Sequence, residues 1–200
     1  SSLNITGPVT VSAWINANSG MTAGAYYNIV TKESIYSNGY GLEIYGSVKR
    51  IEFWTRDSGS TTGYGKWSFS NESNIINQWI HIVGVYDGLS NHIYINGEKK
   101  DTGEGVSPGS SSYPLRIGQS GKVISQDRYF DGSIDEVRIY NRALSSAEVR
   151  HLYEWAPGPV AYWKMDEKSG TAANDSSGNE YNGTINGSPQ WVNGKVGSAI

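Results

Sequence analysis

The stretch WIHIVGVYDGLSNHIYING, residues 79 to 97, decides the fold because it holds two strand patterns joined by turns. Its first part, Trp79–Tyr86, is rich in the β-branched and aromatic residues that favour strands, and it ends at Asp87-Gly88. Its second part, Asn91–Ile95, ends at Asn96-Gly97, a pair that favours the positive φ angles of a hairpin turn. The stretch therefore predicts antiparallel strands connected by tight turns.

Similar strand patterns recur along the chain at short intervals. Val9–Ile15 alternates by two, so its odd-numbered residues share one face. In the next two predicted strands, the residues expected to point into the core are Leu42, Ile44, Ile51 and Phe53. Glu52 and Trp54 then face the other way. Further strands are predicted at residues 115–118, 133–140 and 160–165.

One short helix is predicted after Ser145. This serine is a candidate N-cap residue, and Glu148, three positions later, would complete a capping box. Pro157-Gly158-Pro159 follows the helix and cannot continue it. No other stretch has a helical pattern, so the predicted fold is an all-β antiparallel sandwich with one short helix.

The composition limits the functions that the chain can have. Its 200 residues suit one large sandwich, and its net charge of −3 provides no basic field to attract nucleic acid. No stretch approaches the roughly 20 apolar residues of a membrane-spanning helix. Because there are no cysteines, disulfides do not hold the fold together. The chain begins Ser-Ser, without a signal peptide, which we interpret as a piece of a longer polypeptide or a matured one.

Five motifs span almost the whole chain: VTVSAWI at 9–15, WIHIVGVYDG at 79–88, IYING at 93–97, FDGSIDEVRIYNRAL at 130–144 and PVAYWKMDEKSGTAANDSSGNEYNG at 159–183. Together they resemble the laminin-G-like, concanavalin-A-like lectin (LamG-like jelly-roll) domains of bacterial and archaeal surface proteins. The resemblance implies a jelly-roll sandwich, an extracellular or cell-surface location, and binding rather than catalysis.

The motifs stand in an unusual order. In the family that the chain resembles, the stretch like residues 160–200 opens the domain, and the helix like 145–153 closes it. Residues 1–155 therefore resemble a sandwich that lacks its first strands, residues 156–158 a linker, and residues 159–200 the first strands of this or a neighbouring sandwich. Circular permutation, a fragment of a tandem array, and completion of a neighbouring copy all explain this order, since an unpaired strand edge can accept another chain.

The acidic and histidine residues do not indicate catalysis. Asp135 and Glu136 are adjacent, so on a strand they point to opposite faces and cannot share one glycosidic bond. His81, His92 and His151 lack the spacing of metal ligands. We therefore predict that the chain is not an enzyme.

A turn-rich segment, residues 166–183, is a candidate calcium site. Ca²⁺ prefers about six to eight hard oxygen ligands. Asp175, Asn179 and Asn182 can offer such oxygens from one loop, with Asp135 or Asp166 assisting, and the resemblance favours calcium. The alternative is an Asx-turn loop whose side chains bind its own backbone.

A sugar site would combine an aromatic ring for stacking with polar groups that bind hydroxyls. The candidate residues are Trp54, Tyr64, Trp67, Tyr26, Tyr36 and Asp57. The alternative is that the tryptophans form or cover the core, as we expect for Trp14, Trp79 and Trp163.

These observations support three hypotheses. The first is a non-catalytic extracellular binding or adhesion module whose partner is a glycan or a cell-surface protein. The second is a structural subunit or repeat that joins neighbouring copies of itself by strand complementation. We rank an active glycoside hydrolase or lyase last.

Overall fold

The structure is a computed structural model, and it describes residues 3–19, 26–34, 37–46, 49–69, 75–119, 129–155, 161–176, 180–187, 190–194 and 198–199. The chain divides into two compact units, unit 1 (Ser1–Tyr153) and unit 2 (Glu154–Ile200). The strands and the helix of unit 1 are β1 (Val9–Ala17), β2 (Tyr26–Ser34), β3 (Ser37–Tyr45), β4 (Arg50–Arg56), β5 (Thr62–Ser68), β6 (Trp79–Tyr86), β7 (Ser90–Ile95), β8 (Glu98–Glu104), β9 (Arg116–Ile117), β10 (Gly132–Tyr140) and α1 (Ser146–Trp155), whose last two residues fall in unit 2. No helix among the described residues is long and apolar enough to cross a membrane.

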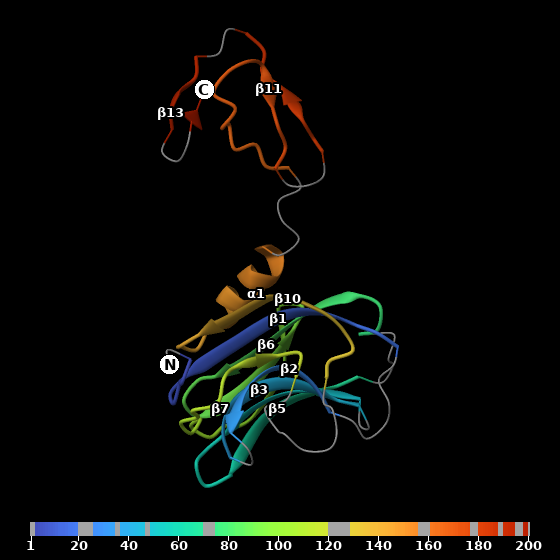
Figure 1. Ribbon diagram of the computed structural model, residues 1–200, viewed down its shortest axis with the longest axis vertical. Coiled ribbons are helices and arrows are strands. Elements are labelled where there is room, and N and C mark those ends of the chain that lie inside the picture. Colours follow the sequence, from blue (N-terminus) through green and yellow to red (C-terminus); the bar gives the residue numbers. More distant parts are fainter. Residues whose placement is uncertain are drawn as a thin grey trace. The chain divides into compact units, whose positions relative to one another are not determined.

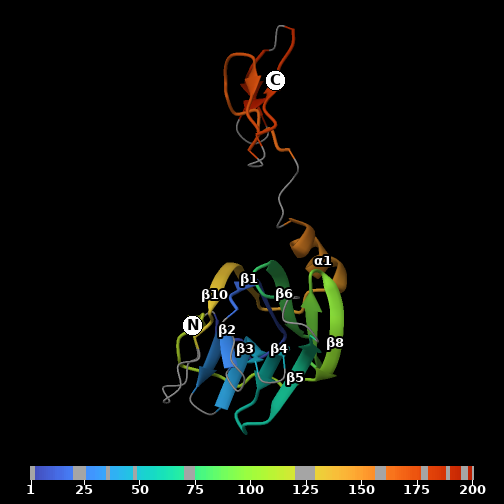
Figure 2. The ribbon, with the colours of Figure 1, turned by 90° about the vertical axis from the view of Figure 1, so that its right-hand side faces the viewer.

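Unit 1 is the predicted antiparallel β-sandwich (Figures 1 and 2). One sheet has the order β10-β1-β6-β7-β8, and we call it the helix-covered sheet because α1 lies on its outer face. The other, which we call the opposite sheet, has the order β5-β4-β3-β2-β9. The predicted all-β class is therefore confirmed.

The core lies between the inner faces of the two sheets. The alternation predicted from the sequence is confirmed here, since the following predicted inward residues are completely buried: Val9, Val11, Ala13, Ile15, Leu42, Ile44, Ile51 and Phe53. At Gly84 of β6 the missing side chain leaves room for the ring of Phe53 of β4 in the opposite sheet. A methyl group at position 84 would lie 2.1 Å from that ring.

The predicted hairpin and helix start are also confirmed. Asn96 and Gly97 both have positive φ angles, 49° and 78°, and they join β7 to β8. At the helix start, the amide of Ser145 donates to Glu148 at 2.9 Å, and the amide of Glu148 donates to the Ser145 hydroxyl at 3.3 Å. This reciprocal pair is the capping box.

A small apolar cluster holds α1 on the helix-covered sheet. Val83 and Val85 of β6 point away from the main core, and they pack with Leu144 and Val149 of the helical segment. Successive residues of β6 point to opposite faces of the sheet. Both of its faces are apolar because the main core covers one face and α1 covers the other.

The strands described in unit 2 are all short: β11 (Ala172–Ala173), β12 (Gly183–Thr184), β13 (Val192–Asn193) and β14 (Ser198–Ala199). They pair as β11-β12 and β13-β14, and none of the described ones pairs with unit 1. The predicted strand at 160–165 is wrong for its described residues, 161–165, which form only one bridge, Trp163 with Asp175. Trp163 is 42% exposed. Completion of a sandwich by residues 159–200 stays a prediction.

Candidate functional site

The outer face of the opposite sheet carries a row of polar residues that crosses four strands. Asn28 of β2 lies opposite Glu43 of β3, Glu43 opposite Glu52 of β4, and Glu52 opposite Lys66 of β5. Two carboxylates directly opposite each other repel and destabilise a sheet unless other groups compensate them. Here Asn28 donates to Glu43 at 3.0 Å, and the guanidinium of Arg50 pairs with Glu52.

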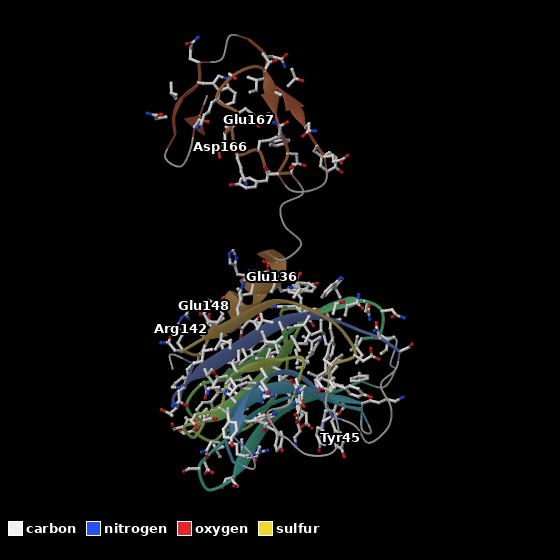
Figure 3. All side chains as sticks on the ribbon, viewed as in Figure 1. Tyr45, Glu136, Arg142, Glu148, Asp166 and Glu167 are labelled. Atoms are coloured by element: carbon white, nitrogen blue, oxygen red, sulfur yellow. The ribbon has the colours of Figure 1, made fainter. Side chains whose placement is uncertain are left out.

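Tyrosine rings surround this polar row. The rings of Tyr26 and Tyr45 stack with centroids 4.2 Å apart, and Tyr45 lies on the far side of the sandwich from α1 (Figure 3). Burial raises the pKa of Tyr26 to about 12, and the neighbouring Tyr45 and the negative charges of Glu43 and Glu52 add to the effect. Tyr26 therefore keeps its hydroxyl proton and can donate a hydrogen bond at neutral pH.

Three of the predicted sugar-binding residues, Tyr26, Trp54 and Tyr64, share this outer face. The expectation that Trp54 is exposed is wrong, because only 2% of its surface is accessible. The guanidinium of Arg56 lies 5.0 Å from its ring centroid, and its ring also packs on Gly41 of the neighbouring strand. The ammonium of Lys66 similarly lies 4.5 Å from the Tyr64 ring centroid. Cations therefore occupy ring faces that a sugar would need.

Two other predicted residues, Asp57 and Tyr36, are not among those described on this face. Asp57 follows β4 and accepts hydrogen bonds from the amides of Gly59, at 2.9 Å, and Thr61, at 2.8 Å. It therefore organises the turn between β4 and β5. Tyr36 lies outside the described residues.

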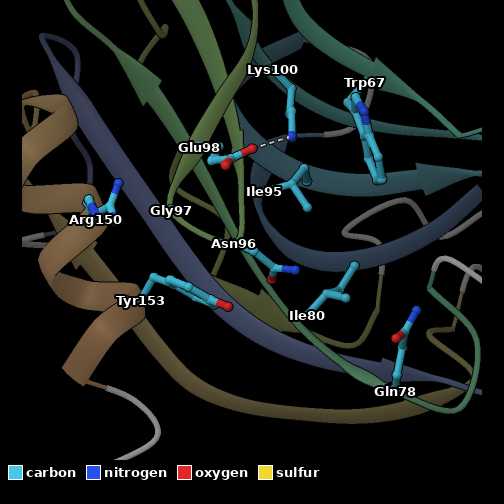
Figure 4. Close-up of a pocket in the computed structure, with 10 residues that line it drawn as sticks. All are labelled: Trp67, Gln78, Ile80, Ile95, Asn96, Gly97, Glu98, Lys100, Arg150 and Tyr153. Carbon is cyan, nitrogen blue, oxygen red and sulfur yellow. Dashed lines mark hydrogen bonds and ion pairs between the residues drawn. The ribbon is translucent and has the colours of Figure 1, made fainter.

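Trp67, the remaining predicted residue, lines a pocket of about 530 Å³ at one edge of the sandwich (Figure 4). The pocket is bounded by β5, by the start of β6, by the β7–β8 hairpin and by α1. Its lining residues are Trp67, Gln78, Ile80, Ile95, Asn96, Gly97, Glu98, Lys100, Arg150 and Tyr153. All of them belong to unit 1. Its volume falls within the range of small-molecule sites.

Apolar side chains hold the shape of this pocket. Ile80 and Ile95 are almost completely buried, so they are fixed by the core. On one side the Trp67 ring packs against Phe69, with centroids 5.9 Å apart. On the other side Tyr153 of α1 stacks on Trp14 at 5.7 Å. Trp67 of β5 and Tyr153 of α1 therefore both line the pocket, and each is held in place by a packed aromatic neighbour.

Polar groups complete the rim. The Asn96 side-chain oxygen accepts a hydrogen bond from the His81 amide at 2.9 Å, which orients the side-chain NH₂ group of Asn96 toward the pocket (Figure 4). Lys100 forms an ion pair with Glu98 at 2.7 Å. The Lys100 hydrogen bond holds the pKa of Glu98 below its ordinary value, and the charge of Arg150 adds to this.

Behind the pocket lies a buried histidine. His81 is 2% exposed, its Nε2 lies 2.9 Å from the Ser12 hydroxyl, and its ring packs against both Trp14 and Tyr153, with centroids at 5.2 and 6.1 Å. Burial, with a smaller contribution from the charge of Arg138, lowers the pKa of His81 to about 4. His81 is therefore neutral at physiological pH and serves as a packed residue beneath the helix.

The predicted calcium ligands are held by hydrogen bonds to the backbone. Asp175 accepts from the amides of Tyr162, at 2.8 Å, and Tyr181, at 3.0 Å. Asn182 in turn accepts from the amide of Asp175 at 2.9 Å. Among the described residues no group of three or more His, Cys, Asp or Glu side chains is placed to hold a metal ion.

The other predicted calcium ligands do not join this loop in one described cluster. Asp166 accepts from the amide of Ser198 at 2.9 Å. Asp135 belongs to β10 in unit 1, where its side chain accepts from the amide of Glu136 at 2.7 Å. Asn179 lies outside the described residues. The oxygens of the loop are directed at amides, as the Asx-turn alternative expects, and calcium binding stays a prediction.

Several residues around these sites could not be chosen from the sequence. Glu43 and Glu52 both occupy outward positions of alternating strands, but only the β3–β4 register shows that they are opposite each other. Tyr153 and Arg150 belong to a short helix whose docking position the sequence does not specify. The Asn96-Gly97 pair did predict the β7–β8 hairpin that bounds the pocket, but it gave no indication of a pocket there.

The sandwich and its edge pocket define a protein of the lectin-like, concanavalin-A-like class. A family model described as "Concanavalin A-like lectin/glucanases superfamily" matches residues 1–150, and the chain belongs to this family. A search of the curated proteins gave no match.

Solved structures of botulinum neurotoxin binding domains have the same fold. The serotype D binding domain is 18% identical with a TM-score of 0.62, and the alignment covers 80% of this chain and 39% of that one. The serotype G binding domain is 22% identical with a TM-score of 0.58, covering 76% and 37%. A serotype D domain in complex with N-acetylneuraminic acid is 18% identical with a TM-score of 0.61, covering 80% and 39%. This chain thus spans about two fifths of those structures, and at such identities the likeness concerns the fold.

Proposed function

We propose that this protein is a non-catalytic, extracellular glycan-binding module whose sugar binds in the pocket beside Trp67. The observation that carries the proposal is the pocket itself, in which an aromatic ring, an apolar floor and polar rim groups converge. Sugar rings present C–H groups that pack on an aromatic face, and their hydroxyls need hydrogen-bond partners. Asn96 and Gln78 offer amides for this purpose. A complex of a structurally similar toxin domain with N-acetylneuraminic acid is consistent with sugar binding on this fold.

The carboxylates of unit 1 support binding without hydrolysis. A glycosidase needs one carboxyl group that donates a proton and another that acts on the sugar from the opposite side. Glu43 and Glu52 face each other but are 7% and 2% exposed, and Asn28 and Arg50 bind them. The Asp135 side chain accepts a hydrogen bond from the Glu136 amide, and the Glu136 carboxylate pairs with Arg138.

We expect the Trp67→Ala variant to lose sugar binding by about tenfold or more, because the stacking surface is removed. The measurement is a glycan array on the intact chain, followed by calorimetry with the best ligand. The matched control is Trp79→Ala, since Trp79 is 46% exposed and lies outside the pocket. Trp67→Leu, which keeps apolar contact with the core, guards against an effect of unfolding. Equal binding by all variants, or release of reducing sugar from the array ligands by the wild type, would contradict the proposal.

We further propose that residues 166–183 bind one structural Ca²⁺. Each carboxylate oxygen can accept more than one interaction, so the backbone bonds of Asp175 leave capacity for an ion. Calcium that binds only the folded state raises the melting temperature by mass action. We expect a higher melting temperature for unit 2 in calcium than in EDTA or magnesium, and no such increase in the Asp175→Asn variant. Identical melting curves in all three solutions would show that the loop is only a turn.

A further inference from the structure

Three charged side chains stand together on the rim of the pocket. Glu98 and Lys100 come from β8, and Arg150 comes from α1. Their formal charges sum to +1. In Figure 4 a dashed line joins the Glu98 carboxylate to the Lys100 ammonium, and the Arg150 side chain extends from α1.

The ion pair between Glu98 and Lys100 holds the Glu98 carboxylate only weakly. Its side chain is 71% exposed, so water competes for it, and an exposed ion pair of this kind contributes little to stability. The Lys100 side chain is less exposed, at 30%, and Arg150 lies in α1, three residues before Tyr153, which stacks on Trp14. Within the Glu98–Lys100 ion pair the acid is therefore the more solvated partner, and another carboxylate can compete with it for the ammonium.

We propose that the pocket selects an anionic sugar, a hexuronic acid residue, whose carboxylate takes the place of Glu98 between Lys100 and Arg150. This inference rests on the proposed sugar site. The sugar ring would pack on Trp67, while Asn96 binds a hydroxyl group. The Lys100 ammonium already binds one carboxylate, and the charge of Arg150 acts on the same carboxylate, so an ammonium and a guanidinium are available for the carboxylate of a ligand.

The inference makes Glu98 an internal competitor of the ligand. Removing the charge of Glu98 therefore strengthens binding of an acidic sugar and leaves a neutral sugar almost unaffected. Removing the charge of Lys100 or Arg150 has the opposite effect on the acidic sugar. If the sugar merely needed polar side chains, removing the charge of Glu98, Lys100 or Arg150 would weaken binding in every case. The direction of the change in affinity in Glu98→Gln is therefore the decisive measurement.

The test uses two probes that differ only in the group at C6, methyl β-galacturonide and methyl β-galactoside. NMR titrations of the intact chain at low and at physiological ionic strength give their affinities. We expect the uronide to bind about tenfold more tightly at low salt, with the preference shrinking as salt is added. Glu98→Gln should raise uronide affinity several-fold, and Lys100→Gln or Arg150→Gln should abolish the preference. Lys99→Gln, the neighbouring lysine whose ammonium lies over the Tyr94 ring, is the matched control and should change nothing.

Two results would overturn the inference in distinguishable ways. If both probes bind equally and both are lost in Trp67→Ala, the pocket is a sugar site without anion selectivity. If neither probe shifts the signals of the pocket residues, the sugar site itself is wrong. A loss of uronide binding in Glu98→Gln would also contradict the inference, because it would make Glu98 a ligand-binding group.

Discussion

Replacing Gly84 by alanine is expected to destabilise the sandwich of unit 1 by about 3 kcal/mol or more. The added methyl group would lie 2.1 Å from Cγ and Cδ2 of Phe53, far inside contact distance. Phe53 is completely buried, and its ring has no solvent into which it could move. Overpacking of a dense core costs about 1–3 kcal/mol or more, and a clash this close lies at the upper end of that scale. A domain is stable by only about 5–15 kcal/mol.

Urea unfolding, followed by the NMR signals of β6, measures this effect in unit 1 alone. The control is Gly7→Ala, because nothing lies within 4 Å of a methyl group at that position. The double variant Gly84→Ala/Phe53→Leu should recover part of the lost stability, since the smaller side chain makes room for the new methyl group. An unchanged urea midpoint for Gly84→Ala would show that the two sheets can separate without cost.

Acidification from pH 6.5 to pH 4 is expected to lower the stability of unit 1 by about 3 kcal/mol through His81. Burial lowers the pKa of His81 from 6.5 to about 4 in the folded protein. In this pH range the unfolded chain binds a proton at His81 that the folded chain does not bind. Stability is therefore complete above pH 6.5 and falls as the pH falls toward 4. The carboxylate of Asp87, whose pKa is lowered to about 2, adds its own loss only below pH 3.8.

The same urea experiment across this pH range tests the expectation. His81→Gln removes the titrating group, and its amide can still bind the Ser12 hydroxyl, so its stability should depend far less on pH between 4 and 6.5. His92→Gln is the matched control, because His92 lies on the neighbouring strand and pairs with Asp87 near the surface. It should keep the pH dependence of the wild type in this window. A flat wild-type profile would mean that water reaches His81.

The sequence was most informative where one physical rule acts alone. Alternation identified the buried residues of β1, β3 and β4, because a strand with one face in the core has no other solution. The Asn96-Gly97 turn and the Ser145–Glu148 capping box were also predicted, since each depends on local backbone chemistry. Fold class and local caps therefore followed from the residues themselves.

The sequence was least informative where several elements meet. Alternation placed Trp54 on the outward side of β4, but it could not show that Arg56 and neighbouring side chains would cover the ring. The expectation that Trp79 and Trp163 are core residues is wrong for the same kind of reason, since they are 46% and 42% exposed. Of the five candidate sugar-binding residues that the structure describes, Trp67 alone lines the pocket, and its partners come from a hairpin and a helix far along the chain.

The tight approach of α1 to the β7–β8 hairpin restricts how this pocket can evolve. Gly97 has a φ of 78°, which asparagine or aspartate could also adopt in a turn, but a side chain there would lie 3.1 Å from the Tyr153 ring and 3.4 Å from the backbone of Arg150. Position 97 thus meets two independent demands, one from the turn and one from the helix. Substitutions at Lys100 or Glu98 leave this backbone contact unchanged, whereas a side chain at position 97 requires the helix wall of the pocket to move by a few tenths of an ångström.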